Sequence, residues 1–356
     1  MKKYRFLFLI GIALLPLLAG CPDTKSVTTM INRDGSCIRT IGDFDPEDFK
    51  GIDSVKHDIP IPVDRSWELV NINDSTAVLR REFESVIELN ALYTSDESEL
   101  KMYKRKVELD KKFRWFHTVF QYRETYDGLL TEIPITNYMS EEEAEVFKSD
   151  DSKDHTLLAN LDKRAQDLLT DNIEERFGLW LNDNIYSMAF DDILGISDSL
   201  GLIDIAEKEV NELKDTIKYM IDQEDKYLLT FDDDQMDPVD VASLVGIEIG
   251  LDSTSISILT KAVTLSRLDE QYENWLLADI ANGHNNQVVL PGQLVDTNAE
   301  LVEGDTLVWH MNSIKFINAD YTMFAESRVT NNWAYILSGF ILTIALIIPF
   351  LRKKKP

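Results

Sequence analysis

Cysteine is nearly missing from this sequence, because only Cys21 and Cys37 occur among its 356 residues. Two cysteines cannot build a disulfide framework, and these two are too far apart for a Cys-x-x-Cys metal or redox pair. We expect Cys37 to pack as a small buried hydrophobe, with an intermolecular bridge as the alternative.

Basic residues are also scarce, with 36 Lys and Arg against 63 Asp and Glu. Without the basic residues of segments 2–5 and 352–355, the rest of the chain has 29 basic against 63 acidic residues, a net charge of −34. A surface of this charge repels phospholipid headgroups and nucleic acid, and no basic stripe offsets it. The composition therefore excludes nucleic acid as a partner.

Common catalytic and cofactor motifs are missing as well. The sequence contains no His-Glu-x-x-His, Gly-x-Ser-x-Gly, Walker loop or Gly-x-Gly-x-x-Gly. The best metal candidates are Asp232, Asp234 and Asp237, but they lack the glycine, the spacing and the closing Glu of an EF-hand. Helix capping and a solvated loop explain these residues better. We therefore predict no catalytic residue, no cofactor and no metal site, although an acidic chain can hold an unrecognised carboxylate pair. The histidines are scattered along the chain: His57, His117, His155, His284 and His310.

The first twenty residues have the layout of an export signal. A positively charged start at 2–5 precedes an apolar stretch at 6–18, and Leu-Ala-Gly-Cys follows at 18–21. These last residues resemble the lipobox of bacterial lipoproteins. The resemblance implies cleavage before Cys21, diacylglycerol on its sulfur and usually acylation of the new amine, and the alternative is an ordinary signal peptide with a chance cysteine. Acyl chains hold a protein to a bilayer because each buried methylene contributes about 0.8 kcal/mol.

A second apolar segment, 333–351, lies near the other end and contains no formal charge. As a helix it would be about 28 Å long, close to the thickness of a bilayer core. The sequence therefore predicts a transmembrane helix with Trp333 and Tyr335 at the interface, and a buried helix of a soluble core is the alternative. The basic tail at 352–356 predicts a cytoplasmic C-terminus by the positive-inside rule.

Both ends predict the same topology. A lipidated Cys21 and a helix over 333–351 place residues 21–332 outside the inner membrane. The expected partners are the lipid bilayer, through the acyl chains on Cys21 and the 333–351 helix, and a protein of unknown identity.

Residues 21–136 form a β-rich region. Segments 27–31 and 37–41 flank Asp34-Gly35, which is a hairpin signal. Two further strands are expected at 102–109 and 113–126, joined by a turn at 110–112. Alternate aromatic residues on the second strand predict one buried face, which leaves Trp115, His117 and Arg123 on the other face, and a ligand groove is the alternative. These aromatic residues are Phe116, Phe120, Tyr122 and Tyr126.

Residues 137–284 have helical periodicity. Ser140 and Glu143 form a capping-box motif, and apolar residues recur at steps of three and four over 157–181 and over 203–221. Asp237-Pro238 predicts a helix start and Gly250 its end. A last helix is expected over 255–281.

The β pattern returns over 285–332, with strands expected near 287–290, 294–295, 306–309 and 321–329. Because sheets need several strands for stability, we expect both β regions to share one domain. The predicted fold is α+β: a membrane-proximal β domain built from both ends of the chain, an inserted helical domain and one C-terminal transmembrane helix.

A family resemblance is carried by Pro291-Gly292 and by the Gly-x-x-x-x-Trp strand at 304–309, ahead of the C-terminal apolar helix. The segment 291–351 resembles the LppM-type bacterial lipoprotein domain, and the Asn- and Asp-rich style is similar to lipoproteins of Bacteroidota. The resemblance implies no activity, and the long helical insertion departs from the small LppM-type domain.

These observations favour a non-enzymatic cell-envelope lipoprotein that presents an acidic helical module to a protein partner. The alternative is an enzyme or ligand carrier with a pocket between the β domain and the insertion. A deep pocket with convergent carboxylates and a histidine would favour the alternative. An exposed apolar patch on the helices would favour the first interpretation.

Overall fold

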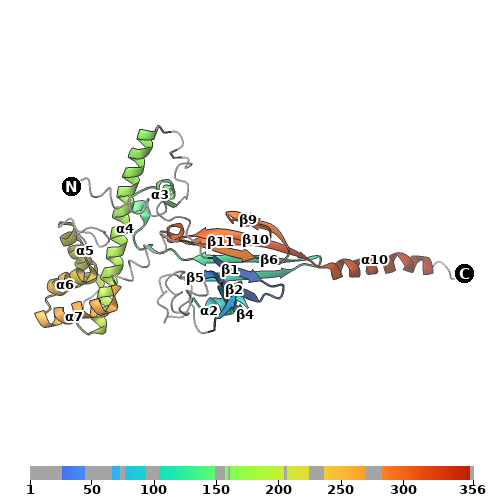
Figure 1. Cartoon of the computed structure of the whole chain (residues 1–356), viewed down its shortest axis with the longest axis horizontal. Coiled ribbons are helices and arrows are strands. Elements are labelled where there is room, and N and C mark those ends of the chain that lie inside the picture. Colours follow the sequence, from blue (N-terminus) through green and yellow to red (C-terminus); the bar gives the residue numbers. More distant parts are fainter. Residues whose placement is uncertain are drawn as a thin grey trace. The chain divides into compact units, whose positions relative to one another are not determined.

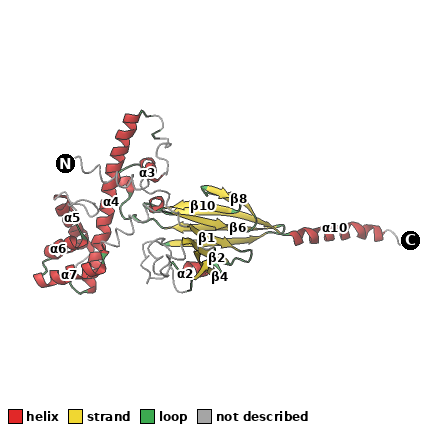
Figure 2. Ribbon diagram, in the orientation of Figure 1, coloured by secondary structure: helices red, strands yellow, loops and turns green. Residues whose placement is uncertain are grey.

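A computed structural model of the chain describes residues 26–44, 66–72, 77–93, 104–148, 157–158, 161–203, 207–223, 236–268 and 283–352. The chain divides into two compact units (Figure 1). The β unit lies within Asp23–Asp127, Gly283–Met311 and Asp320–Pro356, and the helical unit includes Gly128–Asn282 and Asn312–Ala319. Figure 2 shows the strands gathered in the β unit.

The larger sheet of the β unit has the strand order β3-β4-β2-β1-β7-β10-β9. β1 and β2 form the antiparallel hairpin predicted around Gly35, whose φ of 102° suits glycine. β1 also pairs in parallel with β7, so that strands from both ends of the chain share this sheet. The strands are β1 (Ser26–Ile31), β2 (Cys37–Phe44), β3 (Glu68–Asn71), β4 (Ala77–Phe83), β7 (His284–Val289), β9 (Leu301–Glu303) and β10 (Thr306–Met311).

The smaller sheet is antiparallel and has the order β5-β6-β11-β8. The turn predicted at 110–112 is wrong, because these residues pair with Val119–Gln121 inside the β5–β6 ladder and the chain reverses at 114–116. The charged run indicated a turn, but β5 is an edge strand, where charged side chains discourage further pairing. The strands are β5 (Arg105–Phe113), β6 (His117–Tyr126), β8 (Gln293–Thr297) and β11 (Tyr321–Thr330).

The two sheets enclose one core. Phe120, Tyr122 and Tyr126 of β6 are buried, which confirms the core interpretation of the aromatic stripe. Phe116 belongs to the hairpin tip and is 42% exposed, so it leaves the predicted stripe. Cys37 is buried and its thiol is free, and burial raises its pKa to about 11, as expected for a packed side chain.

The chain passes from one sheet to the other at Pro291-Gly292, between β7 and β8. Gly292 has a φ of 95°, and a Cβ at this position would lie 2.3 Å from the backbone oxygen of Arg328. Only glycine fits this crossing, because any side chain would collide with β11.

The helical unit is built on α4, a helix of 37 residues. It begins after the N-cap Asp162, later than the stripe predicted from 157, and buries Ile173, Phe177 and Leu181. The predicted Ser140–Glu143 capping box is confirmed, since each residue's backbone N–H donates to the other's side chain. The helices are α3 (Glu141–Lys148), α4 (Lys163–Ser199), α5 (Glu207–Gln223), α6 (Pro238–Glu248) and α7 (Ser253–Ser266).

Two further helices, α2 (Val86–Ala91) and α10 (Asn332–Arg352), belong to the β unit. In the described part of the chain, no helix has both the length and the apolarity needed to cross a membrane. The predicted transmembrane helix at 333–351 is therefore wrong. The location of residues 21–332 outside the inner membrane was also derived from Cys21 and stays a prediction.

Candidate functional site

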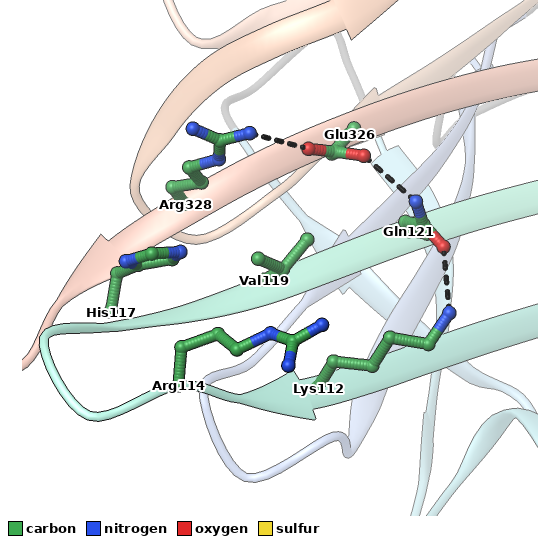
Figure 3. A pocket seen from close by; sticks show the side chains of 7 residues that line it. All are labelled: Lys112, Arg114, His117, Val119, Gln121, Glu326 and Arg328. Carbon is green, nitrogen blue, oxygen red and sulfur yellow. Dashed lines mark hydrogen bonds and ion pairs between the residues drawn. The ribbon is translucent and has the colours of Figure 1, made fainter.

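A hollow of about 310 Å³ opens on the outer face of the smaller sheet (Figure 3). Strand register creates it: Lys112 of β5 and Arg328 of β11 both lie opposite Val119 of β6. Gln121 and Glu326 form the neighbouring row. The hairpin strands β5 and β6 and the distant strand β11 thus deliver polar side chains to one place. The lining residues are Lys112, Arg114, His117, Val119, Gln121, Glu326 and Arg328.

A chain of hydrogen bonds crosses the hollow (Figure 3). Lys112 Nζ donates to Gln121 Oε1 at 3.2 Å, and Gln121 Nε2 donates to Glu326 Oε2 at 2.8 Å. Arg328 Nη2 donates to the other oxygen of Glu326 at 3.3 Å. The hydrogen bond from Gln121 and the pairing with Arg328 lower the pKa of Glu326. Glu326 is therefore ionised near neutral pH and does not act as a proton donor there.

Positive charge prevails among the lining residues. The lining of the hollow includes Lys112, Arg114 and Arg328 and one carboxylate, Glu326, and Lys112 also pairs with Asp110 Oδ2, outside the lining, at 3.3 Å. Among the residues that the structure describes, the Arg114 guanidinium has no acidic partner. His117 joins these residues from the start of β6 (Figure 3). This composition suits an anion better than a cation or an apolar ligand.

Exposed aromatic rings border the hollow where the β5–β6 hairpin tip meets α10. Trp333 stacks on Phe113, with ring centroids 6.2 Å apart, and meets Trp115 edge-on at 5.3 Å. Phe116 lies 4.7 Å from Tyr335, also between ring centroids. We call Phe113, Trp115, Phe116, Trp333 and Tyr335 the aromatic collar. Its members are between 42% and 57% exposed.

Hydrogen bonds fix the collar to the first turns of α10. Asn331 Nδ2 donates to the backbone oxygen of Arg114 at 2.8 Å, and the Asn331 backbone N–H donates to that of Phe116 at 2.9 Å. Trp115 Nε1 donates to Ser338 Oγ at 2.8 Å. Arg114 of the hollow lies between the collar residues Phe113 and Trp115 in the chain, so both features include the tip of the β5–β6 hairpin.

A second concentration of ionisable groups lies between the two sheets. The carboxylate of Glu124 accepts hydrogen bonds from Arg39 Nη2 at 2.8 Å, Arg105 Nη1 at 3.3 Å and the Tyr122 hydroxyl at 2.6 Å. Burial opposes the ionisation of Glu124, but the two arginines and Tyr122 outweigh it and lower its pKa to about 2. We call Arg39, Arg105, Tyr122 and Glu124 the buried network.

The buried network is closed to substrates, since the side chains of Arg39, Arg105 and Glu124 are 0% exposed. His284 lies in the same core, and neither ring nitrogen has a hydrogen-bond partner in the described part of the chain. Burial first, and then Arg105, lowers the pKa of His284 to about 3, so its ring is neutral near pH 7. These groups stabilise the fold and have no access to a reacting molecule.

The predicted site residues do not come together. Cys21, Asp232 and Asp234 lie outside the described residues. Asp237 caps α6: its Oδ1 accepts from the backbone N–H of Asp240 at 2.9 Å, which confirms the capping interpretation for this residue. In the part of the chain that the structure describes, no group of three or more His, Cys, Asp or Glu residues could hold a metal.

Sequence reasoning missed the cationic hollow. The negative net charge of the chain indicated that it has no basic surface. A net charge is a sum over the whole chain, however, and does not show a local excess of positive charge. Lys111-Lys112 and Arg114 are a local signal, but the sequence predicts a turn at 110–112 and places Arg114 in the strand expected at 113–126. Arg328 is more than 200 positions away, and only the β6–β11 pairing brings it to the same surface.

We find no family model, no curated protein and no solved structure that matches this chain. Its function is therefore argued from the geometry of these surfaces, and the LppM-type resemblance stays a prediction.

Proposed function

We propose that this protein is a non-enzymatic cell-envelope lipoprotein, tethered through acyl chains on Cys21, which displays its helical unit to a protein partner. The surface hollow gives some support to this proposal, because its described lining holds a single carboxylate, Glu326, beside His117 and so offers no convergent carboxylates of the kind that the enzyme alternative requires. The buried network also supports it, because its ionisable groups are enclosed in the core.

The observation that carries the proposal is an apolar stripe on α7. Ile258 is 48% exposed and Leu265 is 72% exposed, and seven residues separate them, so they lie two turns apart on one side of the helix. Ile247 of α6 is 61% exposed. Single exposed apolar residues are ordinary, but residues aligned on one helix face are the anchors that an apolar groove recognises. An acidic chain that keeps such a stripe in water is suited to a protein partner.

Site-specific cross-linking tests the partner. A photo-reactive residue is placed at Ile258 or Leu265 in the full chain in its host, and at Thr264 as a control on another side of α7. We expect one discrete adduct from positions 258 and 265 and none from 264. The Leu265→Asp variant should lose the adduct formed from position 258. Equal adducts from all three positions, or none from any, would contradict the proposed docking stripe.

The lipid anchor has a separate test. Cys21→Ser should abolish fatty-acid labelling and stall cleavage of the signal, because the thiol that accepts diacylglycerol is gone. Cys37→Ser is the matched control, and it should be labelled as strongly as the unchanged chain. Labelling of the Cys21→Ser variant at the original level would refute the lipoprotein assignment.

A further inference from the structure

We propose that the hollow and the aromatic collar form a docking surface for the phosphate groups of a lipid bilayer. This inference rests on the proposed lipid tether, and it names the face of the β unit that lies on the bilayer. The cations of the hollow contact lipid phosphates, and the collar lies at the depth of the headgroups.

Charge complementarity is the first argument. The chain between its two basic ends has a net charge of −34. Most of its surface is therefore repelled by an anionic membrane. The hollow reverses this locally: Lys112 pairs with Asp110 and Arg328 with Glu326, and the charge of Arg114 is left over. Arg114 is available for a new anion because it has no acidic partner among the described residues. Its planar guanidinium can bind a phosphate through two parallel hydrogen bonds.

The collar is the second argument, and it selects a lipid phosphate over a soluble one. Trp and Tyr side chains are enriched at membrane–water interfaces because each has an apolar ring and a polar end. Trp333 is 51% exposed and Tyr335 is 54% exposed, and they contact Trp115 and Phe116 of the hairpin tip that carries Arg114. A site for a soluble anion has no need for five exposed aromatic rings at its border.

The beginning of α10 is the third argument. Ile336 is 73% exposed and Phe340 is 62% exposed, and both follow the collar on a helix that leaves the end of the sheet (Figure 1). An apolar surface of this kind is unfavourable in water. Contact with the bilayer at the collar would remove these side chains from water.

Native mass spectrometry of the full chain in detergent micelles tests the inference. The protein is mixed with dioleoylphosphatidylglycerol, or with dioleoylglycerol, which has the same acyl chains but no phosphate. We expect the phospholipid to remain bound at least five times more often than the diacylglycerol. The double variant Arg114→Gln/Arg328→Gln should lower phospholipid retention at least fivefold.

The matched control is Lys106→Gln/Arg123→Gln, which removes two cations from β5 and β6 on the same outer face but outside the hollow. It should bind like the unchanged chain. Equal losses in both double variants would indicate a general charge effect and overturn the proposal, as would full retention in the hollow variant. If millimolar inorganic phosphate displaces the lipid, the hollow binds a soluble anion, and the proposal that it binds lipid phosphates is overturned. Labelling of Cys21 is independent of these outcomes, so failure of the docking surface and failure of the lipoprotein assignment are distinguishable.

Discussion

Both units have ion pairs at their surfaces, but among the described residues only the β unit also has ion pairs with both side chains fully buried. In the β unit, Arg39 and Glu124 pair with both side chains 0% exposed. In the helical unit, Arg176 and Glu143 pair at 2.6 Å with side chains 28% and 20% exposed. A buried charge that loses its partner is strongly unfavourable, whereas water replaces the partner at a surface pair. Ion pairs should therefore determine the stability of the β unit far more than that of the helical unit.

The two units also differ in how far apart in sequence their hydrogen-bonded residues are. Thr28 Oγ1 donates to Gln287 Oε1 across 259 positions, within the parallel β1–β7 pair. The helical unit relies more on short-range contacts, such as the capping boxes of α3 and α6. The β unit thus requires distant segments to meet, and the buried network helps to specify how they meet.

The largest effect is expected for Glu124→Gln, which removes the buried carboxylate that Arg39 and Arg105 share. The unfolding free energy of the β unit should fall by about 3–5 kcal/mol. Amide hydrogen exchange, followed separately on β6 and α4, measures the loss in each unit. The matched change Glu143→Gln removes the surface partner of Arg176 and should cost less than about 1 kcal/mol. If the two variants lost equal unfolding free energy, each in its own unit, the proposed difference between the units would be wrong.

Acid should destabilise the β unit before the helical unit. The pKa of His284 is about 3 in the folded chain, whereas its ordinary value is 6.5. Between pH 3 and pH 6.5, the unfolded chain therefore binds a proton at His284 that the folded chain does not bind. The stability from this group is complete above pH 6.5 and is lost as the pH falls toward 3, with about 2 kcal/mol gone by pH 5. Glu124 adds a loss in the same direction below pH 4.5.

Amide hydrogen exchange of β6 at pH 7 and pH 5 measures how the unfolding free energy of the β unit depends on pH. The exchange of α4 in the same samples is the internal reference. His284→Leu removes the titrating ring and should flatten the slope of β6 over this interval. An unchanged slope in that variant would show that His284 is not the source.

The smallest effect is expected at the α6 cap. Asp237→Ala should cost the helical unit about 1 kcal/mol, because the backbone N–H of Asp240 loses its acceptor. Asp237→Asn keeps an acceptor and should lose less. Calcium should leave the thermal midpoint of the unchanged chain where it is, whereas a rise of several degrees would restore the metal interpretation of Asp232, Asp234 and Asp237.

Local signals in the sequence determined several elements correctly. The Gly35 hairpin, the Ser140–Glu143 capping box and the Asp237-Pro238 helix start all depend on residues at most a few positions apart. The alternation of aromatic residues on β6 also identified the buried face and left His117 on the opposite side. Such signals are readable because backbone geometry links neighbouring residues directly.

Tertiary structure decided the rest. Apolarity near 333–351 predicted a helix, and α10 is one, but the predicted membrane crossing is contradicted in the described part of the chain. Pro291-Gly292 indicated a turn, yet the chain crosses there from one sheet to the other. Glu124 lies in the aromatic stripe and is stable there because Arg39 and Arg105 arrive from other strands. Likewise, Arg328 joins Arg114 only through the register of β6 and β11. Whether a charge can be buried, or forms part of a site, depends on partners that only strand pairing brings near, and no local pattern encodes that pairing.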